Sequence, residues 1–147
     1  MALNPQYQPI AQTFVQQYYQ FLDDPAQRVN MANFYNEEKS LMTFEGQQLF
    51  GRAKIMEKVQ GLQFQKIAHS ITMVDSHPMF NGGILVSVLG QLKNFLELYY
   101  TLSILFCVSQ TDDDPAHAFN QTFILKPIAD SFYVEHDIFR LNLHHAA

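Results

Sequence analysis

The sequence has no tryptophan and only one cysteine, Cys107. One cysteine cannot form a disulfide within the chain or a cysteine-based metal motif, so we expect a reduced, intracellular protein without a metal site. Charged residues are also scarce, at 16% of the chain, with 9 Lys and Arg against 14 Asp and Glu. A net charge of -5 without a basic run argues against nucleic acid as a partner. It favours a partner that carries a basic patch.

Long apolar runs and targeting signals are missing as well. The first residues lack the basic and apolar regions of a secretory signal, and no apolar run approaches the ~20 residues of a membrane helix, so we expect no membrane partner. Apolar residues are nevertheless abundant, at 48% of the 147 residues, and 13 of them are phenylalanines. This length suits one core, and without repeats or linkers we predict a single domain over residues 1–147.

Helical spacing dominates the first part of the chain. Apolar residues recur three and four positions apart over residues 5–22, which predicts an amphipathic helix. Asp24-Pro25 resembles a helix N-cap followed by proline at the first helical position. We therefore predict a second helix that reaches Tyr35 and turns Val29 and Phe34 inward.

A short hairpin and a third helix are expected next. Residues 40–50 predict two short strands around Gly46. Between Gly51 and Gly61, apolar residues return to helical spacing, which predicts a helix.

From residue 64 the apolar period changes to two, which is typical of strands. Turn residues at 81–83 separate the first two strands. The inward-facing residues of the first three strands are predicted to be Ile67, His69, Ile71 and Met73; Ile84, Val86, Val88, Gly90 and Leu92; and Phe119, Gln121, Phe123 and Leu125. A last strand is expected from Phe132 to Leu143. Helices followed by strands predict an α+β fold, with three helices packed on one face of a bent antiparallel sheet.

Motifs spread along the chain carry a family resemblance. The stretches are Phe14-Val15-Gln16-Gln17-Tyr18-Tyr19, Met42-Thr43-Phe44-Glu45-Gly46-Gln47-Gln48, Phe64-Gln65-Lys66-Ile67-Ala68-His69-Ser70-Ile71-Thr72, Leu89-Gly90-Gln91-Leu92-Lys93, Asp112-Asp113-Asp114-Pro115 and Asp137-Ile138-Phe139-Arg140-Leu141. In order and spacing they resemble the nuclear transport factor 2 family, over nearly the whole chain except about residues 94–110. The resemblance implies a cone-shaped fold, a homodimer formed sheet to sheet, no catalysis and no cofactor.

The resemblance also implies partners. They are the GDP-bound form of the small GTPase Ran and the phenylalanine-glycine repeats of nucleoporins, for a nuclear import carrier found in the cytoplasm, the nucleus and the nuclear envelope at the pore. The acidic groups that would pair with Ran are Glu45, Asp112 and Asp114. Without the resemblance, a turn carboxylate and a run of aspartates are usually solvated loop residues.

A pocket for a Ran phenylalanine is implied around Phe44, which would also contact nucleoporin repeats. Phe44 stands where vertebrate members carry tryptophan, so it keeps the apolar area and loses the indole N–H. The other implied pocket residues are Leu62, Ile67, His69, Leu92 and Phe139. Each apolar member has plain core packing as its alternative, and a lone histidine on an apolar face is more often a core group than a ligand.

The last strand is implied to lie in the dimer interface, through Asp137, Ile138 and Arg140. The alternative is ordinary packing within the chain's own sheet.

A segment of 17 residues, Asn94 to Gln110, departs from the family, which passes almost directly from Gly-Gln-Leu-Lys to the acidic loop. The segment is nearly uncharged, and its periodicity does not decide between strand and helix. Three origins fit: a longer hairpin, an element that touches a membrane or partner, or a translated intron. In any of these cases it could move Asp112 away from Glu45.

Two other functions compete with the carrier. The same fold hosts isomerases and dehydratases that use Asp and His in the cone, for which His69, Asp75 and Asp137 are the candidates. The second competing function is that of an adaptor. It would bind nucleoporin repeats but would have lost Ran binding because of the inserted segment.

Overall fold

The computed structural model describes residues 3–62, 67–93 and 116–144. The inserted segment, Asp112 and Asp114 lie outside these residues. The helices and strands follow in the order α1 (Tyr7–Asp23), η1 (Arg28–Phe34), β1 (Leu41–Phe44), β2 (Gln47–Phe50), α2 (Gly51–Gln60), β3 (Ala68–Pro78), β4 (Ile84–Lys93), β5 (His117–Ile128) and β6 (Ser131–Leu141). The α+β order expected from the sequence is therefore confirmed.

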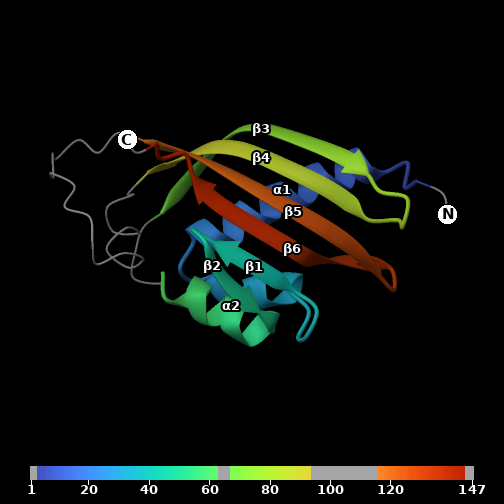
Figure 1. The fold of residues 1–147 in the computed structure, drawn as a ribbon, viewed down its shortest axis with the longest axis horizontal. Coiled ribbons are helices and arrows are strands. Elements are labelled where there is room, and N and C mark those ends of the chain that lie inside the picture. Colours follow the sequence, from blue (N-terminus) through green and yellow to red (C-terminus); the bar gives the residue numbers. More distant parts are fainter. Residues whose placement is uncertain (1–2, 63–66, 94–115, 145–147) are drawn as a thin grey trace, which may run out of the picture.

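Helix α1 confirms the first predicted helix and lies across the sheet, behind the strands in Figure 1. One face of α1 is buried, through Ala11, Phe14, Val15, Tyr18, Tyr19 and Leu22. The rings of Phe14 and Tyr18 contact the ring of Phe123 on β5 at centroid distances of 4.9 and 4.8 Å. Such edge-on aromatic contacts combine large apolar burial with favourable ring geometry, and they fix α1 over the middle of the sheet.

The second helix is a 3₁₀ helix that begins at Arg28, so the predicted start at Asp24-Pro25 and the predicted inward direction of Val29 are wrong. A 3₁₀ helix has three residues per turn, which turns Arg28 and Met31 inward and leaves Val29 59% exposed. Asp24 instead ends α1, and its Oδ1 accepts a hydrogen bond from the amide of Ala26 at 3.0 Å.

The buried arginine joins two helix ends. Arg28 is 1% exposed. Its Nε donates to the carbonyl of Leu22 at 2.6 Å, and its Nη1 donates to the carbonyl of Leu62. Because a buried charge is tolerated only when it is well hydrogen-bonded, this arginine holds the end of α1 next to the end of α2.

The hairpin and the third helix confirm their predictions. Strands β1 and β2 are joined by a two-residue turn in which Glu45 has φ 49° and Gly46 has φ 88°. A tight hairpin turn of this kind needs positive φ at both central residues, which explains the glycine. Helix α2 then buries Ile55, Met56 and Val59.

The sheet has the strand order β2-β1-β6-β5-β4-β3 and is bent around α1 (Figure 1). Most neighbouring strands are antiparallel, as predicted, but β1 pairs with β6 in parallel, with Phe44 opposite Phe139. The sheet is therefore mixed. A parallel neighbour needs a long crossover connection, and β1 and β6 are the first and last of the described strands along the chain.

Alternation predicted the buried face well in β4 and β5, where the predicted inward residues are buried. Gly90 is required there because a Cβ at this position would lie 2.6 Å from the Ser70 carbonyl oxygen and 2.8 Å from the Phe119 ring. In β3 the prediction for Met73 is wrong: the register shifts between Ile71 and Met73, and Met73 is 54% exposed. A bulge adds one residue and reverses the facing of those that follow.

Candidate functional site

A pocket opens between α1, α2 and the concave face of the sheet. We call it the central pocket. It is lined by Tyr18, Leu22, Met42, Phe44, Lys58, Val59, Leu62, Ile67, His69, Gln121 and Phe139. Five of the six residues predicted for a pocket are among them, from four separate parts of the chain. The sixth, Leu92 on β4, is fully buried and does not line the pocket.

The pocket is narrow in this structure. Its free volume is ≈ 20 Å³, about the room of one water molecule. Two aromatic rings lie along one wall, since Phe44 stacks on Phe139 with a centroid distance of 4.8 Å and an interplanar angle of 10°. The ammonium group of Lys58 lies 5.5 Å from the centre of the Phe44 ring. An aromatic side chain of a partner could enter only if these rim side chains moved.

His69 forms another part of the pocket wall and is held by Asp23 at the end of α1. The carboxylate of Asp23 accepts the backbone N–H of His69 at 2.9 Å, and its other oxygen lies 2.5 Å from Nδ1 of the imidazole. The His69 side chain is 4% exposed, whereas that of Asp23 is 27% exposed. The imidazole also packs against the rings of Tyr19 and Phe119, at 4.9 and 5.2 Å. His69 is thus oriented by a carboxylate that also ties α1 to β3.

Behind the pocket lies a buried polar network centred on Asp137. Oδ2 of Asp137 accepts hydrogen bonds from the hydroxyls of Tyr35 at 2.8 Å and Tyr18 at 3.1 Å, and Oδ1 accepts one from Nε2 of Gln121 at 2.7 Å. Oε1 of Gln121 accepts the hydroxyl of Tyr19 at 2.5 Å. The three partners of Asp137 are all neutral, so the carboxylate is held by hydrogen bonds to uncharged groups.

Burial raises the pKa of Asp137 to about 6, although the hydrogen bonds from Gln121, Tyr35 and Tyr18 act in the opposite direction. Burial and the nearby Asp137 charge likewise raise the pKa of Tyr18 and Tyr35 well above the usual value of a phenol. The tyrosines therefore stay protonated and donate. Desolvation exceeds hydrogen bonding here because the partners of the buried carboxylate carry no positive charge.

The turn residue Glu45 lies where β1 meets the end of β6. Its backbone N–H donates to the Phe139 carbonyl at 3.1 Å, and Oε1 accepts the backbone N–H of Leu141 at 2.5 Å. The carboxylate is therefore fixed to the end of β6, and Glu45 remains partly exposed. Asp112 and Asp114, the other predicted acidic groups, lie outside the described residues.

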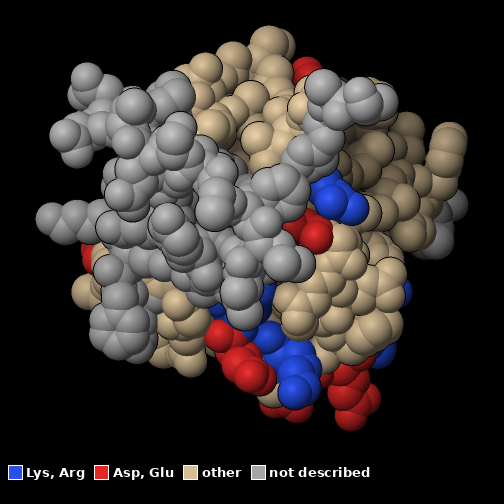
Figure 2. All heavy atoms as spheres, turned by 60° about the vertical axis from the view of Figure 1, so that its left-hand side comes forward, with Lys and Arg blue, Asp and Glu red and all other residues tan. Residues whose placement is uncertain are grey.

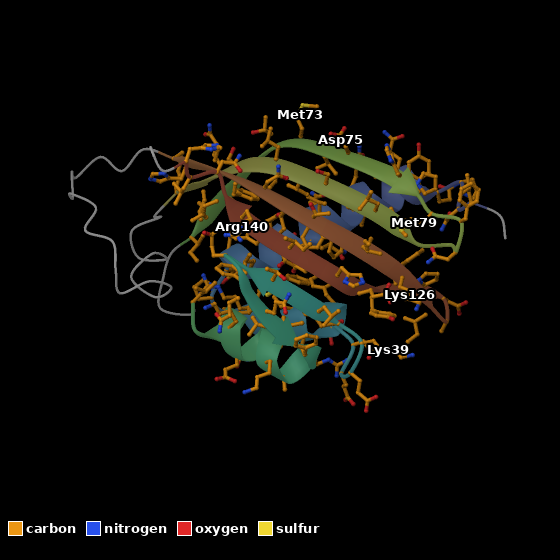
Figure 3. The ribbon with its side chains drawn as sticks, viewed as in Figure 1. Lys39, Met73, Asp75, Met79, Lys126 and Arg140 are labelled. Carbon is orange, nitrogen blue, oxygen red and sulfur yellow. The ribbon has the colours of Figure 1, made fainter. Side chains whose placement is uncertain are left out.

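The sheet face turned away from α1 carries exposed apolar side chains. Ile138 is 48% exposed and Leu89 41%, and Met73 and Leu89 are opposite each other. Figure 3 shows Met73 and Asp75 along β3 and Arg140 near the end of β6. Ile138 and Arg140 thus face outward as an interface requires.

The predicted interface role of Asp137 needs correction. Its side chain is fully buried within its own chain and faces the concave side of the sheet. It cannot contact a second chain directly, because strand residues alternate between faces and Ile138 takes the outward direction.

The three residues considered for catalysis do not converge. His69 lines the central pocket and Asp137 is buried behind it, but Asp75 is exposed on the edge strand β3, opposite Ser87. In the described ranges, no group of three or more His, Cys, Asp or Glu side chains is arranged to hold a metal ion. Within the same ranges, no helix is both long and apolar enough to cross a membrane.

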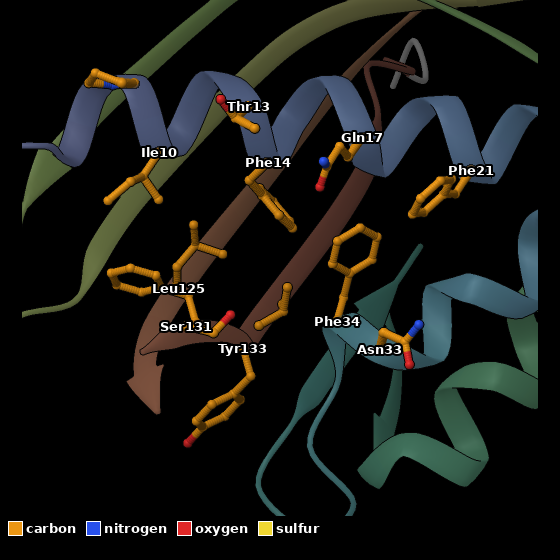
Figure 4. A pocket seen from close by; sticks show the side chains of 13 residues that line it. Ile10, Thr13, Phe14, Gln17, Phe21, Asn33, Phe34, Leu125, Ser131 and Tyr133 are labelled. Carbon is orange, nitrogen blue, oxygen red and sulfur yellow. The ribbon is translucent and has the colours of Figure 1, made fainter. Parts of the chain in front are cut away.

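A larger groove of ≈ 490 Å³ runs along the other side of α1, next to the β5–β6 hairpin (Figure 4). Rings of Phe14, Phe21 and Phe34 point into it, and Thr13, Gln17 and Asn33 supply polar atoms. Among the described residues, those that line the groove include no Asp, Glu, His, Lys or Arg. Catalysis by charged or imidazole groups therefore has no support there, and the central pocket remains the candidate site.

Sequence reasoning missed several residues that build the central pocket. From the sequence, Lys58 resembles an ordinary lysine on the surface of a helix. Gln121 was predicted to face inward, but no hydrogen-bond partner was predicted for it. One feature of the sequence could have indicated the polar network. The hydroxyl of a buried tyrosine usually has a hydrogen-bond partner, so an internal polar group could be expected near Tyr18, Tyr19 and Tyr35.

Comparison with known proteins gives a consistent result. Residues 10–110 and 102–141 match the family described as the nuclear transport factor 2 (NTF2) domain. A Caenorhabditis elegans protein named "Probable nuclear transport factor 2" is 41% identical over 148 aligned residues, covering 98% of this chain and 98% of the relative. Nuclear transport factor 2 of Saccharomyces cerevisiae is 38% identical over 134 residues, covering 90% of this chain and 92% of the relative. These names support a role in nuclear transport.

Solved structures agree in fold. Nuclear transport factor 2 from Cryptosporidium parvum superposes with a TM-score of 0.73 at 32% identity, covering 97% of this chain and 99% of that one. A putative scytalone dehydratase from Novosphingobium aromaticivorans has a TM-score of 0.67 at 9% identity, covering 95% and 89%, so the fold is shared with enzyme-like proteins. The two relatives by sequence described above are named as transport factors. On these matches and on its cone-shaped fold, the chain belongs to the nuclear transport factor 2 family.

Proposed function

We propose that this protein is a nuclear import carrier that binds the GDP-bound form of the small GTPase Ran and the phenylalanine-glycine repeats of nucleoporins. The observation that carries the proposal is the central pocket. Phe44, Leu62, Ile67, His69 and Phe139 come together there from separate elements. Their mostly apolar wall suits an aromatic side chain, and a family with a nuclear transport role supplies the partner class.

Binding would begin with opening of the pocket rim. The free volume of ≈ 20 Å³ is too small for a phenyl ring. Phe44 and Lys58 are only partly buried and form the rim, so they are the groups that would move. Insertion of the ring would then exchange the Phe44–Phe139 contact for contacts with the partner. Tyr18 and Gln121, which line the pocket, would keep their buried hydrogen bonds to Asp137.

Glu45 would supply the charge complementarity. Its carboxylate is held by the amide of Leu141, next along the chain to the pocket residue Phe44, so little side-chain entropy is lost on binding a basic side chain. The net charge of -5 adds long-range attraction for a basic partner surface. Asp112 and Asp114 are proposed to join Glu45 in the complex.

The protein is proposed to act as a homodimer, with the outward face of the sheet as the interface. Ile138 lies within this face, and Arg140 lies beside Gly46 of the β1–β2 turn, with Nη2 3.3 Å from where a Cβ would be. Phe44 is proposed to contact nucleoporin repeats as well as Ran. The carrier would move between cytoplasm and nucleus through the pore at the nuclear envelope.

Calorimetric titration with purified Ran tests the proposal. Wild type should bind Ran loaded with GDP and not Ran loaded with a non-hydrolysable GTP analogue. Glu45→Gln should weaken binding roughly 10-fold, because a rim charge pair held in place is worth on the order of 1 kcal/mol or more. Glu38→Gln is the matched control, since Glu38 is an exposed turn residue. Equal affinity of wild type and Glu45→Gln would refute the role of Glu45, and no binding by any variant would refute the carrier function.

A second candidate rests on the position of the inserted segment. Asn94 to Gln110 directly precedes the acidic residues, so the protein could be an adaptor that binds nucleoporin repeats but not Ran. Titration of a variant that lacks residues 94–110 separates the two. If only the shortened variant binds Ran-GDP, while both bind a phenylalanine-glycine peptide, the adaptor is correct.

A further inference from the structure

Lys58 occupies a position between two depressions of the surface. Its side chain lines the central pocket on one side, and on the other a shallow groove of ≈ 280 Å³ formed with Gln47, Leu49, Lys54 and Glu57. The ammonium group donates to Oε1 of Gln47 at 2.9 Å and lies over the Phe44 ring. Lys58 is thus a cation at the very rim through which a partner side chain would pass.

The charge of Lys58 is poorly compensated by the part of the chain that the structure describes. Among the described residues, no carboxylate lies within ion-pair distance of its ammonium group, and its contacts are a neutral amide and a ring. Lys54, one turn earlier on α2, pairs instead with Glu57 at 3.8 Å. Partial burial lowers the pKa of Lys58, which shows that the site disfavours an unpaired cation.

Figure 2 shows acidic and basic side chains mixed over the lower part of the molecule, where α2 lies in Figure 1. Charges of both signs therefore lie on this part of the surface. Glu45 directly follows Phe44 and is held to the end of β6, whereas Lys58 lies over the Phe44 ring, so groups of opposite charge lie near the β1–β2 turn. A surface of this kind fits a partner segment that itself carries both signs.

We propose that Lys58 is a specificity-determining residue that receives a carboxylate of the partner, located next to the apolar side chain that enters the central pocket. The inference rests on the proposed binding of Ran-GDP and extends it, since the acidic groups alone would select any basic surface. A partner that offers only basic groups would be repelled by Lys58. Phe44 would have to move when the pocket opens, which would weaken the cation–ring contact and direct the ammonium group toward the incoming chain.

The proposal is tested by whether the affinity for Ran-GDP falls when the charge of Lys58 is removed. Ran-GDP is titrated calorimetrically onto wild type, Lys58→Gln, Lys58→Met and Lys58→Arg, with Lys54→Gln as the matched control one turn away. The two neutral variants should bind roughly 5- to 10-fold more weakly. Lys58→Arg should bind within about 2-fold of wild type, because it keeps the charge, and Lys54→Gln should be unchanged. A moderate salt increase should reduce the difference between wild type and Lys58→Gln.

Two outcomes would overturn the inference and are distinguishable from failure of the proposed function. Unchanged or tighter binding by both neutral variants would show that the partner presents no carboxylate at Lys58. Loss of binding in Lys58→Arg as large as in Lys58→Gln would show that the lysine shape, and not its charge, is required. Absence of binding by wild type would instead refute the proposed function, and this inference with it. Thermal unfolding of each variant establishes that the fold is intact.

Discussion

The buried carboxylate of Asp137 should make the stability of this protein fall as the pH rises from about 4 to 7. Its pKa is about 6 in the folded protein against an ordinary value of 3.8. The folded state therefore favours the protonated form. The stability that this preference contributes is present below pH 3.8 and is lost as the pH rises through 6. With ~1.4 kcal/mol for each pKa unit, the full loss is about 3 kcal/mol.

Replacement of Asp137 by asparagine isolates this effect, because the amide has nearly the same shape and does not titrate. The introduced side-chain amide carries N–H donors, and Nε2 of Gln121 is also a donor, so two donors would face each other there. A loss of stability that does not depend on pH is therefore expected as well. The quantity of interest is thus the change with pH. The stability of wild type minus that of Asp137→Asn should decrease by roughly 2–3 kcal/mol between about pH 4 and pH 7.

Urea unfolding at fixed ionic strength measures this difference in stability. The protein concentration is also kept fixed, because dimerisation would stabilise the folded state. Fluorescence of the tyrosines or circular dichroism reports the transition, since tryptophan is absent. A difference that does not change with pH would refute the reasoning. A difference that increases with pH would show that the hydrogen bonds from Tyr18, Tyr35 and Gln121 outweigh burial, and that the pKa is lowered.

Three further substitutions have expected outcomes. Gly90→Ala should destabilise the fold by about 2–3 kcal/mol in the same unfolding assay, since the added methyl would meet the Ser70 carbonyl oxygen at 2.6 Å; a smaller effect would mean that β3 moves aside easily. Ser40→Ala should cost about 1–3 kcal/mol, because the buried Ser40 hydroxyl donates to the Val134 carbonyl at 2.5 Å; a neutral result would show that water replaces it. Ile138→Glu should convert the proposed dimer to monomer, because an unpaired carboxylate would be buried; sedimentation as an intact dimer at low micromolar concentration would contradict the proposed interface.

Local pattern predicted much of the fold. Helix α1 and strands β4 and β5 were predictable because a single period persists through each of them, and each buries one continuous face. The turn at Gly46 was predictable because few residues tolerate its backbone conformation. These elements need only local information.

Other features depend on contacts distant in the sequence. The inward face of the second helix was mispredicted at Val29, because an α-helical period was applied to a 3₁₀ helix. The bulge before Met73 reversed the facing of half of β3, and no residue type marks it. The parallel pairing of β1 with β6 depends on which strand lies next to β1 after the chain has crossed the sheet. The alternation of apolar residues along a strand does not reveal its neighbours.

The candidate site was predicted in part, and only through the family resemblance. Apolar pocket residues such as Ile67 and Phe139 are indistinguishable from core residues by pattern alone. The burial of Asp137 could not be anticipated, because carboxylates are usually exposed. Its tyrosine and glutamine partners lie 16 to 119 residues away along the chain.

The strand order imposes a sequence of events on folding. Strand β6 comes after the other described strands in the chain, yet it lies between β1 and β5 and is hydrogen-bonded to both. The β1–β2 hairpin, made early in synthesis, therefore has no place in the sheet until residues 131–141 have been made. Until then the exposed edges of β1 and β5 are open to pairing with other chains, as unpaired strand edges generally are. A chain that ended before Ser131 would thus leave both of these strand edges unpaired.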